Sequence, residues 1–82
     1  MVFEKNEIIA LSDGNKHIVV EAMEYENKFY YYVALVDEEQ QAVKDKLEVI
    51  TTVEENGNTF VRRVRGELGA TLTAIFNEKL GI

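Results

Sequence analysis

Apolar and aromatic residues gather in one run near the middle of the chain, KFYYYVALVD at residues 28–37. It is the longest apolar run in the sequence, and polar residues close it at both ends. Aromatic and β-branched side chains favour strands, in which successive residues point to opposite faces. The run therefore predicts the central strand of a small antiparallel sheet, with the segments on either side as its partners.

Two strands are expected before this run, at residues 7–12 and 17–25. Asp13 and Gly14 lie between them, and Asp-Gly is typical of turns because glycine adopts positive φ without penalty. The second strand does not alternate cleanly, since Val19 and Val20 are adjacent. This irregularity indicates either a strand that is buried on both faces or a β-bulge.

The first hairpin is expected to turn at Asn27 and Lys28, which pairs Glu26 with Phe29. Cross-strand partners point to the same side of a sheet. One side then carries Val20, Ala22, Phe29, Tyr31, Val33 and Leu35, and the other carries Met23, Tyr25, Tyr30, Tyr32, Ala34 and Val36. A slip of one residue would exchange the two sets.

A second hairpin follows a polar loop at residues 37–46, which is low in β-propensity. Residues 47–54 form its first strand, and Asn56-Gly57 is the strongest short hairpin signal available. This turn pairs Val53 with Phe60 and Thr51 with Arg62. The hairpin adds an apolar surface continuous with the first, made of Leu47, Val49, Val53, Phe60 and Val64.

Apolar residues near the C-terminus recur with the spacing of an amphipathic helix, at Leu68, Leu72, Ile75, Phe76 and Leu80. The helix is expected to begin at Gly69 or Ala70 and to end at Gly81, a favoured C-cap residue. We therefore predict a single α+β domain over residues 1–82. It is a small antiparallel β-meander of four to five strands and two hairpins, covered on one face by a single C-terminal helix. The expected core includes Leu35, Val49, Phe60, Leu72 and Phe76.

Three segments carry a resemblance to a known family: EAMEYENKFYYYVALVDEE, KLEVITTVEENGNTFVRRV and LTAIFNEKL. Together they cover most of the chain, and they resemble the YrzB-like family of small acidic bacterial proteins. The motifs are structural, and the function of the family is itself unknown. The resemblance therefore implies a fold and a bacterial or bacteriophage origin, but no reaction.

Charge narrows the range of partners. The net charge is −6, and the last 21 residues carry four basic and two acidic side chains, so the acidic excess lies in the first three quarters of the chain. An acidic surface argues against direct binding of nucleic acid or of anionic membranes, and it permits a basic partner. With no cysteine, no signal peptide and no apolar run long enough to span a bilayer, we expect a cytoplasmic protein.

Catalytic and metal-binding signatures are missing from the sequence. His17 is the only histidine and there is no cysteine, so the usual ligand sets for transition metals cannot be assembled. The acidic groups fall at hairpin tips and in the polar loop, where water keeps paired carboxylates ionised. We therefore expect no enzyme, no cofactor and no metal.

Two candidate interaction surfaces remain. If the helix covers the Phe29 side of the sheet, the opposite side exposes Met23, Tyr25, Tyr30 and Tyr32, and exposed aromatic residues with a methionine are typical of interfaces. The alternative is that the sheet curls and buries them, or that the tyrosines simply tolerate solvent with their hydroxyls hydrated. The second surface is the acidic loop Asp37, Glu38 and Glu39, which displays negative charge.

These surfaces favour a non-catalytic protein-binding or regulatory module of a bacterium or bacteriophage, with a homodimer through the tyrosine side as one form. The alternative is a phage-encoded inhibitor of a nucleic-acid-handling enzyme, of the anti-restriction or anti-CRISPR type. In that case the acidic groups would mimic DNA phosphates and occupy a basic groove of the partner.

Overall fold

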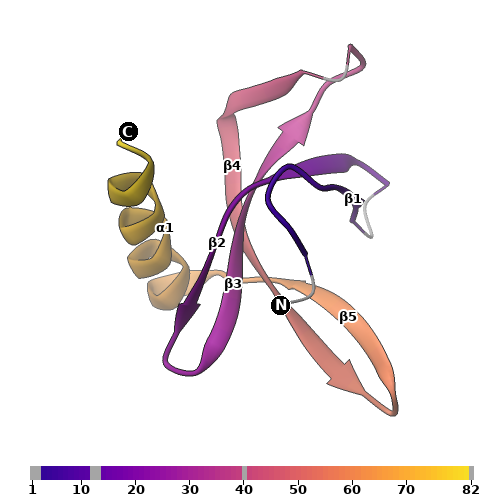
Figure 1. Ribbon diagram of the computed structural model, residues 1–82, viewed down its shortest axis with the longest axis vertical. Coiled ribbons are helices and arrows are strands. Elements are labelled where there is room, and N and C mark those ends of the chain that lie inside the picture. The colour runs from indigo at the N-terminus through magenta and orange to yellow at the C-terminus, as the bar shows by residue number, and fades with distance from the viewer. Residues whose placement is uncertain (1–2, 12–13, 40, 82) are drawn as a thin grey trace.

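The computed structural model describes residues 3–11, 14–39 and 41–81, and it omits the side chains of residues 42–45. Its elements are β1 (Ile8–Ala10), β2 (Lys16–Tyr25), β3 (Lys28–Val36), β4 (Ala42–Glu55), β5 (Asn58–Arg63) and α1 (Gly66–Leu80). The five strands form one antiparallel sheet in the order β1-β2-β3-β4-β5, so each strand pairs with its neighbour in sequence. The sheet curls, and α1 lies against one of its faces (Figure 1). The predicted α+β meander with one C-terminal helix is confirmed, and β3 is its central strand.

The first hairpin turns one residue earlier than expected. Glu26 and Asn27 are the loop residues, with φ of 50° and 66°, and Tyr25 pairs with Lys28. Positive φ at both loop residues is the geometry of a type I′ turn, which suits asparagine. For residues 21–25 of β2, each partner on β3 thereby moves by two positions, so Met23 pairs with Tyr30 and the predicted pairing is wrong. A shift of two keeps these side chains on their predicted faces, whereas the bulge farther along β2 puts Val19 on the side of Val33, where Val20 was predicted.

A β-bulge interrupts β2, as one of the two alternatives for its irregular pattern predicted. The pairing with β3 shifts between Val19 and Glu21. Val19, which pairs with Val33, is therefore the valine that is completely buried, while Val20 is half-buried. The N-terminal segment completes the backbone bonds of this residue. The Asn6 N–H donates to the Val19 carbonyl at 2.7 Å, and the Val19 N–H donates to the Glu7 carbonyl at 2.8 Å.

Strand β4 begins at Ala42, five residues before the predicted start, so half of the expected loop at residues 37–46 is strand. Pairing with β3 overrides the low β-propensity of this segment, and a register shift between Ala34 and Val36 accommodates it. The second hairpin agrees with its prediction. Asn56 and Gly57 have φ of 52° and 82°, and the pairs run from Glu55 with Asn58 to Ile50 with Arg63.

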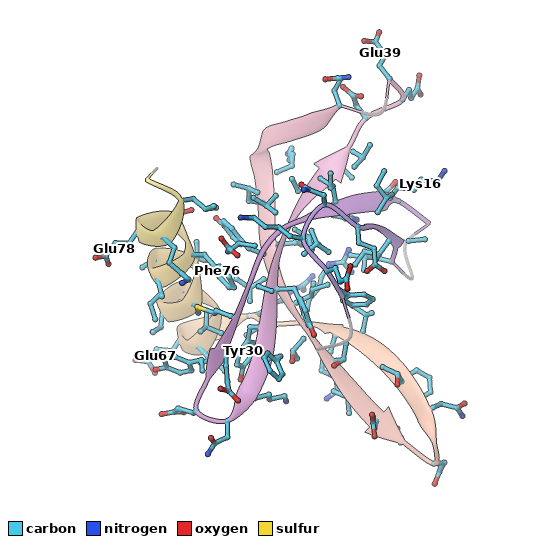
Figure 2. The ribbon with its side chains drawn as sticks, in the orientation of Figure 1. Lys16, Tyr30, Glu39, Glu67, Phe76 and Glu78 are labelled. Atoms are coloured by element: carbon cyan, nitrogen blue, oxygen red, sulfur yellow. The ribbon has the colours of Figure 1, made fainter. Side chains whose placement is uncertain are left out.

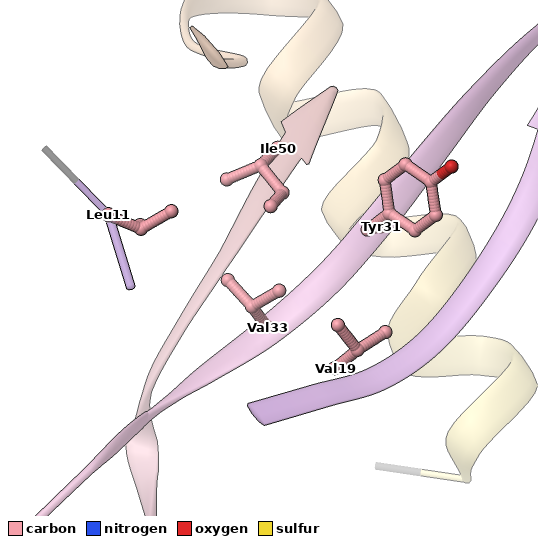
Figure 3. Packing of buried hydrophobic residues seen from close by; sticks show 5 residues of the cluster. All are labelled: Leu11, Val19, Tyr31, Val33 and Ile50. Atoms are coloured by element: carbon pink, nitrogen blue, oxygen red, sulfur yellow. The ribbon is translucent and has the colours of Figure 1, made fainter. Parts of the chain in front are cut away.

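Both faces of the sheet carry a core. Residues of the first core, on the face opposite α1, are Leu11, Val19, Tyr31, Val33 and Ile50 (Figure 3). The N-terminal segment closes this face, and Phe3 packs edge-on against Tyr31 with ring centroids 5.1 Å apart. The second core, beneath α1, consists of Tyr30, Tyr32, Val49, Leu72 and Phe76.

The helix therefore covers the side of the sheet opposite to the one predicted. Tyr32 pairs with Val49, which joins the apolar side of the second hairpin to the tyrosine side of β3. Val64, the second residue before α1, packs against this same core, so the chain enters the helix on that side. The register between β3 and β4 thus decides which face the helix covers.

The helix begins at Gly66, three residues before the earlier of the two predicted starts. Its last residue is Leu80, and Gly81 caps it with φ of 77°, as predicted. Gly69 is buried in its first turn, where a Cβ atom would lie 2.6 Å from the Val64 carbonyl oxygen. Within the described ranges, no helix is long and apolar enough to cross a membrane.

Three residues of the predicted core are buried as expected, namely Val49, Leu72 and Phe76. The prediction is wrong for the other two. Leu35 is half-buried, and the side chain of Phe60 is 50% exposed on β5.

Candidate functional site

The tyrosine side was the first candidate surface, and its residues do share one face of the sheet. Their predicted exposure is wrong, because Tyr30 and Tyr32 are 6% and 2% exposed beneath α1. The Tyr32 ring stacks on Phe76 with centroids 5.0 Å apart, and its hydroxyl donates a hydrogen bond to Asn77 Oδ1 at 2.8 Å. Burial raises the pKa of Tyr32. These two rings hold the helix on the sheet and are not available to a partner.

Met23 and Tyr25 lie at the margin of the same core and are half-buried. The Tyr25 ring packs edge-on against Tyr30 with centroids 6.4 Å apart. Met23 and Ile75 line a groove of about 510 Å³ between β2 and α1. The surface that remains of the tyrosine side is thus limited to this groove and its charged rim.

The acidic loop was the second candidate surface, and Asp37, Glu38 and Glu39 are all exposed. The Asp37 carboxylate also organises the loop itself, because its Oδ1 accepts the backbone N–H groups of Glu39 at 2.9 Å and Gln41 at 2.8 Å. Figure 2 places Glu39 and Tyr30 toward opposite ends of the sheet. The structure therefore does not bring the two candidate surfaces together.

Strand β5 is a candidate that the sequence did not reveal. It is the last strand of the sheet, and all its residues from Asn58 to Arg62 are exposed. Phe60 is 50% exposed and Val61, on the opposite side of the strand, is 38% exposed. The hairpin that carries them extends away from α1 (Figure 1). Alternation of apolar residues predicts a strand, but it does not indicate that both faces of that strand meet solvent.

The outer edge of β5 presents unpaired backbone groups. The Val64 N–H donates to the Val49 carbonyl at 2.9 Å, which continues the ladder with β4. Backbone groups in an antiparallel pair point alternately toward the partner and away from it. Phe60 and Arg62 therefore direct theirs to β4, while Thr59 and Val61 direct theirs outward. Within the described part of the chain, neither Thr59 nor Val61 forms a backbone hydrogen bond outside the sheet.

A polar cluster on the face opposite α1 is the second feature that the sequence did not reveal. His17 is 4% exposed, and its Nε2 lies 3.5 Å from Glu48 Oε1. The Arg63 Nε donates to both oxygens of Glu48, at 3.0 and 3.2 Å. These residues come from β2, β4 and β5, so only the folded sheet brings them together. Among the described residues, no three histidine or acidic side chains are placed to hold a metal ion.

Comparisons with models of protein families, with curated proteins and with solved structures give no match for this chain. The resemblance to the YrzB-like family stays a prediction. A function is therefore inferred from the geometry of the chain itself.

Proposed function

We propose that this protein is a non-catalytic protein-binding module that holds an extended segment of its partner against strand β5. The observation that carries this proposal is the exposure of β5 along its length, with half-exposed Phe60 on one side and Val61 on the other. An unpaired edge strand with exposed apolar residues is a template for pairing with another chain. Peptide recognition by strand addition uses such edges, with backbone bonds for affinity and side chains for specificity.

The side chains of β5 indicate the chemistry of the partner. Phe60 and Arg62 lie two residues apart and share one side of the strand, while Val61 lies on the other. A paired segment would place one residue beside each of them. The matching segment therefore carries an apolar residue beside Phe60 and, two positions away on the same side, an acidic residue beside Arg62. A partner of this kind, with an apolar and acidic segment, differs from the partner with a basic groove that the acidic loop would bind.

A single substitution separates the edge from the rest of the fold. In Val61→Pro the backbone N–H that points outward is lost, and the bonds to β4 are kept because they use Phe60 and Arg62. Val61→Ala is the matched control, since it shortens the side chain and retains the N–H. Short linear peptides from a displayed library, selected on the wild type, should bind Val61→Pro at least about tenfold more weakly, a change of ~1.4 kcal/mol.

The control variant should lose much less affinity, and the selected peptides should share the apolar and acidic spacing. Equal binding to wild type and Val61→Pro, or a selection that yields no peptide preferring the wild type, would contradict the proposal. Pairing of β5 with β5 of a second copy would appear instead as a dimer in light scattering that Val61→Pro abolishes. That outcome would replace the peptide partner with a second copy of this chain.

A second candidate function is the inhibitor of a nucleic-acid-handling enzyme, and the exposure of the acidic loop favours it. Because Asp37 organises the loop, the informative variant keeps it and replaces Glu38 and Glu39 with glutamine. Binding to a basic enzyme groove should then weaken, and it should also weaken steeply with added salt. Binding that is insensitive to salt and to this double change would exclude the phosphate-mimic function. Either function suits a reduced compartment such as the cytoplasm, because the chain has no cysteine.

A further inference from the structure

A cavity of about 290 Å³ opens on the sheet next to the polar cluster. Its lining includes His17, Leu35, Lys46, Leu47, Glu48 and Arg63. Ligand pockets usually have volumes of about 300–1,000 Å³, so this one suits a small ligand. Four strands contribute to the lining, and the cavity is therefore a product of the curled sheet.

Charge in this cavity differs in sign from that of the whole chain. Among the described side chains of the lining, Lys46 and Arg63 contribute two positive charges and Glu48 one negative charge, so their sum is positive while the chain carries −6. The Glu48 carboxylate is held by the Arg63 Nε, which fixes the position of both groups. A cavity with a single excess positive charge favours a monoanion, and Glu48 disfavours ligands with more negative charge.

His17 is the buried residue of the lining. Its side chain lines the cavity and is nine-tenths or more buried, and its Nδ1 has no hydrogen-bond partner among the described residues. Buried polar atoms in folded proteins are normally satisfied, because leaving one unpaired costs stability. Charged groups that face this ring come from β4 and β5, namely Lys46, Glu48 and Arg63. Nδ1 is inaccessible from the cavity, so it is the remaining edge of the imidazole ring that borders the site.

We propose that this cavity binds a small organic carboxylate. The carboxylate group lies beside Lys46 and Arg63, within reach of the His17 ring, and the apolar body of the ligand contacts Leu35. The Leu35 side chain gives the lining an apolar surface that an inorganic anion would leave uncovered. Binding at this cavity does not require strand addition at β5, because the cavity lies on the face of the sheet opposite α1 and not along the outer edge of β5.

Benzoate is a suitable probe, since it combines a carboxylate with an apolar body, and benzamide is its neutral counterpart. In a titration followed by amide resonances, benzoate should cause saturable shifts centred on His17, Lys46, Glu48 and Arg63. Benzamide should cause none. The absence of saturable benzoate shifts, or equal shifts with benzamide, would overturn the proposal. Inorganic phosphate that binds at least as tightly as benzoate would also overturn it, because the site would then select an inorganic anion.

Lys46→Gln tests the site without disturbing the core, because Lys46 is exposed. The variant should raise the dissociation constant for benzoate about tenfold, the usual effect of one hydrogen bond to a charged group. Lys28→Gln is the matched control, since it removes the same charge from the exposed tip of the first hairpin. If both variants weaken benzoate binding equally, the binding depends only on the net charge of the chain. That result would contradict a specific site in this cavity.

Discussion

At the residue scale, Tyr32 connects the sheet to the helix through two contacts of different kinds. Its ring stacks on Phe76, and its hydroxyl donates to Asn77 Oδ1 at 2.8 Å. Tyr32→Phe keeps the ring and removes only the hydrogen bond, so the free energy of unfolding should fall by about 0.5–1.5 kcal/mol. Urea denaturation measures this change. Tyr25→Phe is the control, since its ring is half-buried at the same core, and a loss as large as that of Tyr32→Phe would contradict the assigned bond.

The same residue predicts how stability depends on alkaline pH. Burial raises the pKa of Tyr32 above its ordinary value of 10.0, while the hydrogen bond to Asn77 lowers it less. The unfolded chain therefore ionises this tyrosine first. Its stabilising contribution is complete below pH 10.0 and is lost as the pH rises through the folded-state pKa. Wild type should lose stability above this pH more steeply than Tyr32→Phe, and parallel pH profiles would contradict the shift.

Gly69 shows how a local preference yields to packing. Alanine normally stabilises a helix relative to glycine by up to about 1 kcal/mol. At this position its Cβ would lie 2.6 Å from the Val64 carbonyl oxygen, so the helix must move away from the strand. Gly69→Ala should therefore destabilise the domain by about 1–2 kcal/mol, as overpacking does. Thermal denaturation checks this, with Thr71→Ala at an exposed helix position as the control that should not destabilise.

At the scale of elements, two phenylalanines differ in burial, one in the helix–sheet core and one on the exposed hairpin. Phe76 is fully buried on α1, whereas Phe60 is 50% exposed on β5 (Figure 2 labels Phe76). Phe76→Ala should cost about 3–5 kcal/mol, and Phe60→Ala should change stability by about 0.5 kcal/mol or less. Chemical denaturation of both variants measures the contrast. Similar losses would mean that the hairpin is packed against another part of the molecule.

Local patterns predicted each element but not every contact between elements. The second hairpin agrees pair by pair, because Asn56-Gly57 selects a two-residue turn and thereby sets the register. The first hairpin lacks such a signal, and its turn lies one residue earlier than expected. The helix covers the other face because Tyr32 pairs with Val49, and this register lies beyond a polar connection at residues 37–41 and a register shift in the β3–β4 pairing. No residue pattern within that connection determines the register beyond it.

The same limit explains the candidate sites. Tyr30 and Tyr32 are buried because the helix covers their face of the sheet. The prediction that they are exposed was wrong because it placed the helix on the other face. The polar cluster requires residues from three strands, which no motif in the sequence joins. Exposure of β5 depends on its place at the end of the sheet order. Local propensity is visible in the sequence, whereas these sites are properties of strand order and register.

At the scale of the whole molecule, each face of the sheet is closed by a different terminal segment. The N-terminal segment covers one face and α1 covers the other, which leaves the β4–β5 hairpin extended beyond both. A domain of this size has little core to spare, and its net stability is expected to be about 5–10 kcal/mol. A strand that is exposed on both faces adds little to that stability. Its composition of β-branched and aromatic residues therefore supports a role in binding.

Hydrogen exchange at single amides of β5 tests the central claim most directly. In the free protein, the Thr59 and Val61 amides should exchange quickly because they point outward, and those of Phe60 and Arg62 should be protected by the ladder with β4. When a selected peptide is bound, Thr59 and Val61 should become protected as well, since a new strand would accept their bonds. A bound peptide that leaves the exchange of Thr59 and Val61 unchanged would contradict strand addition at this edge.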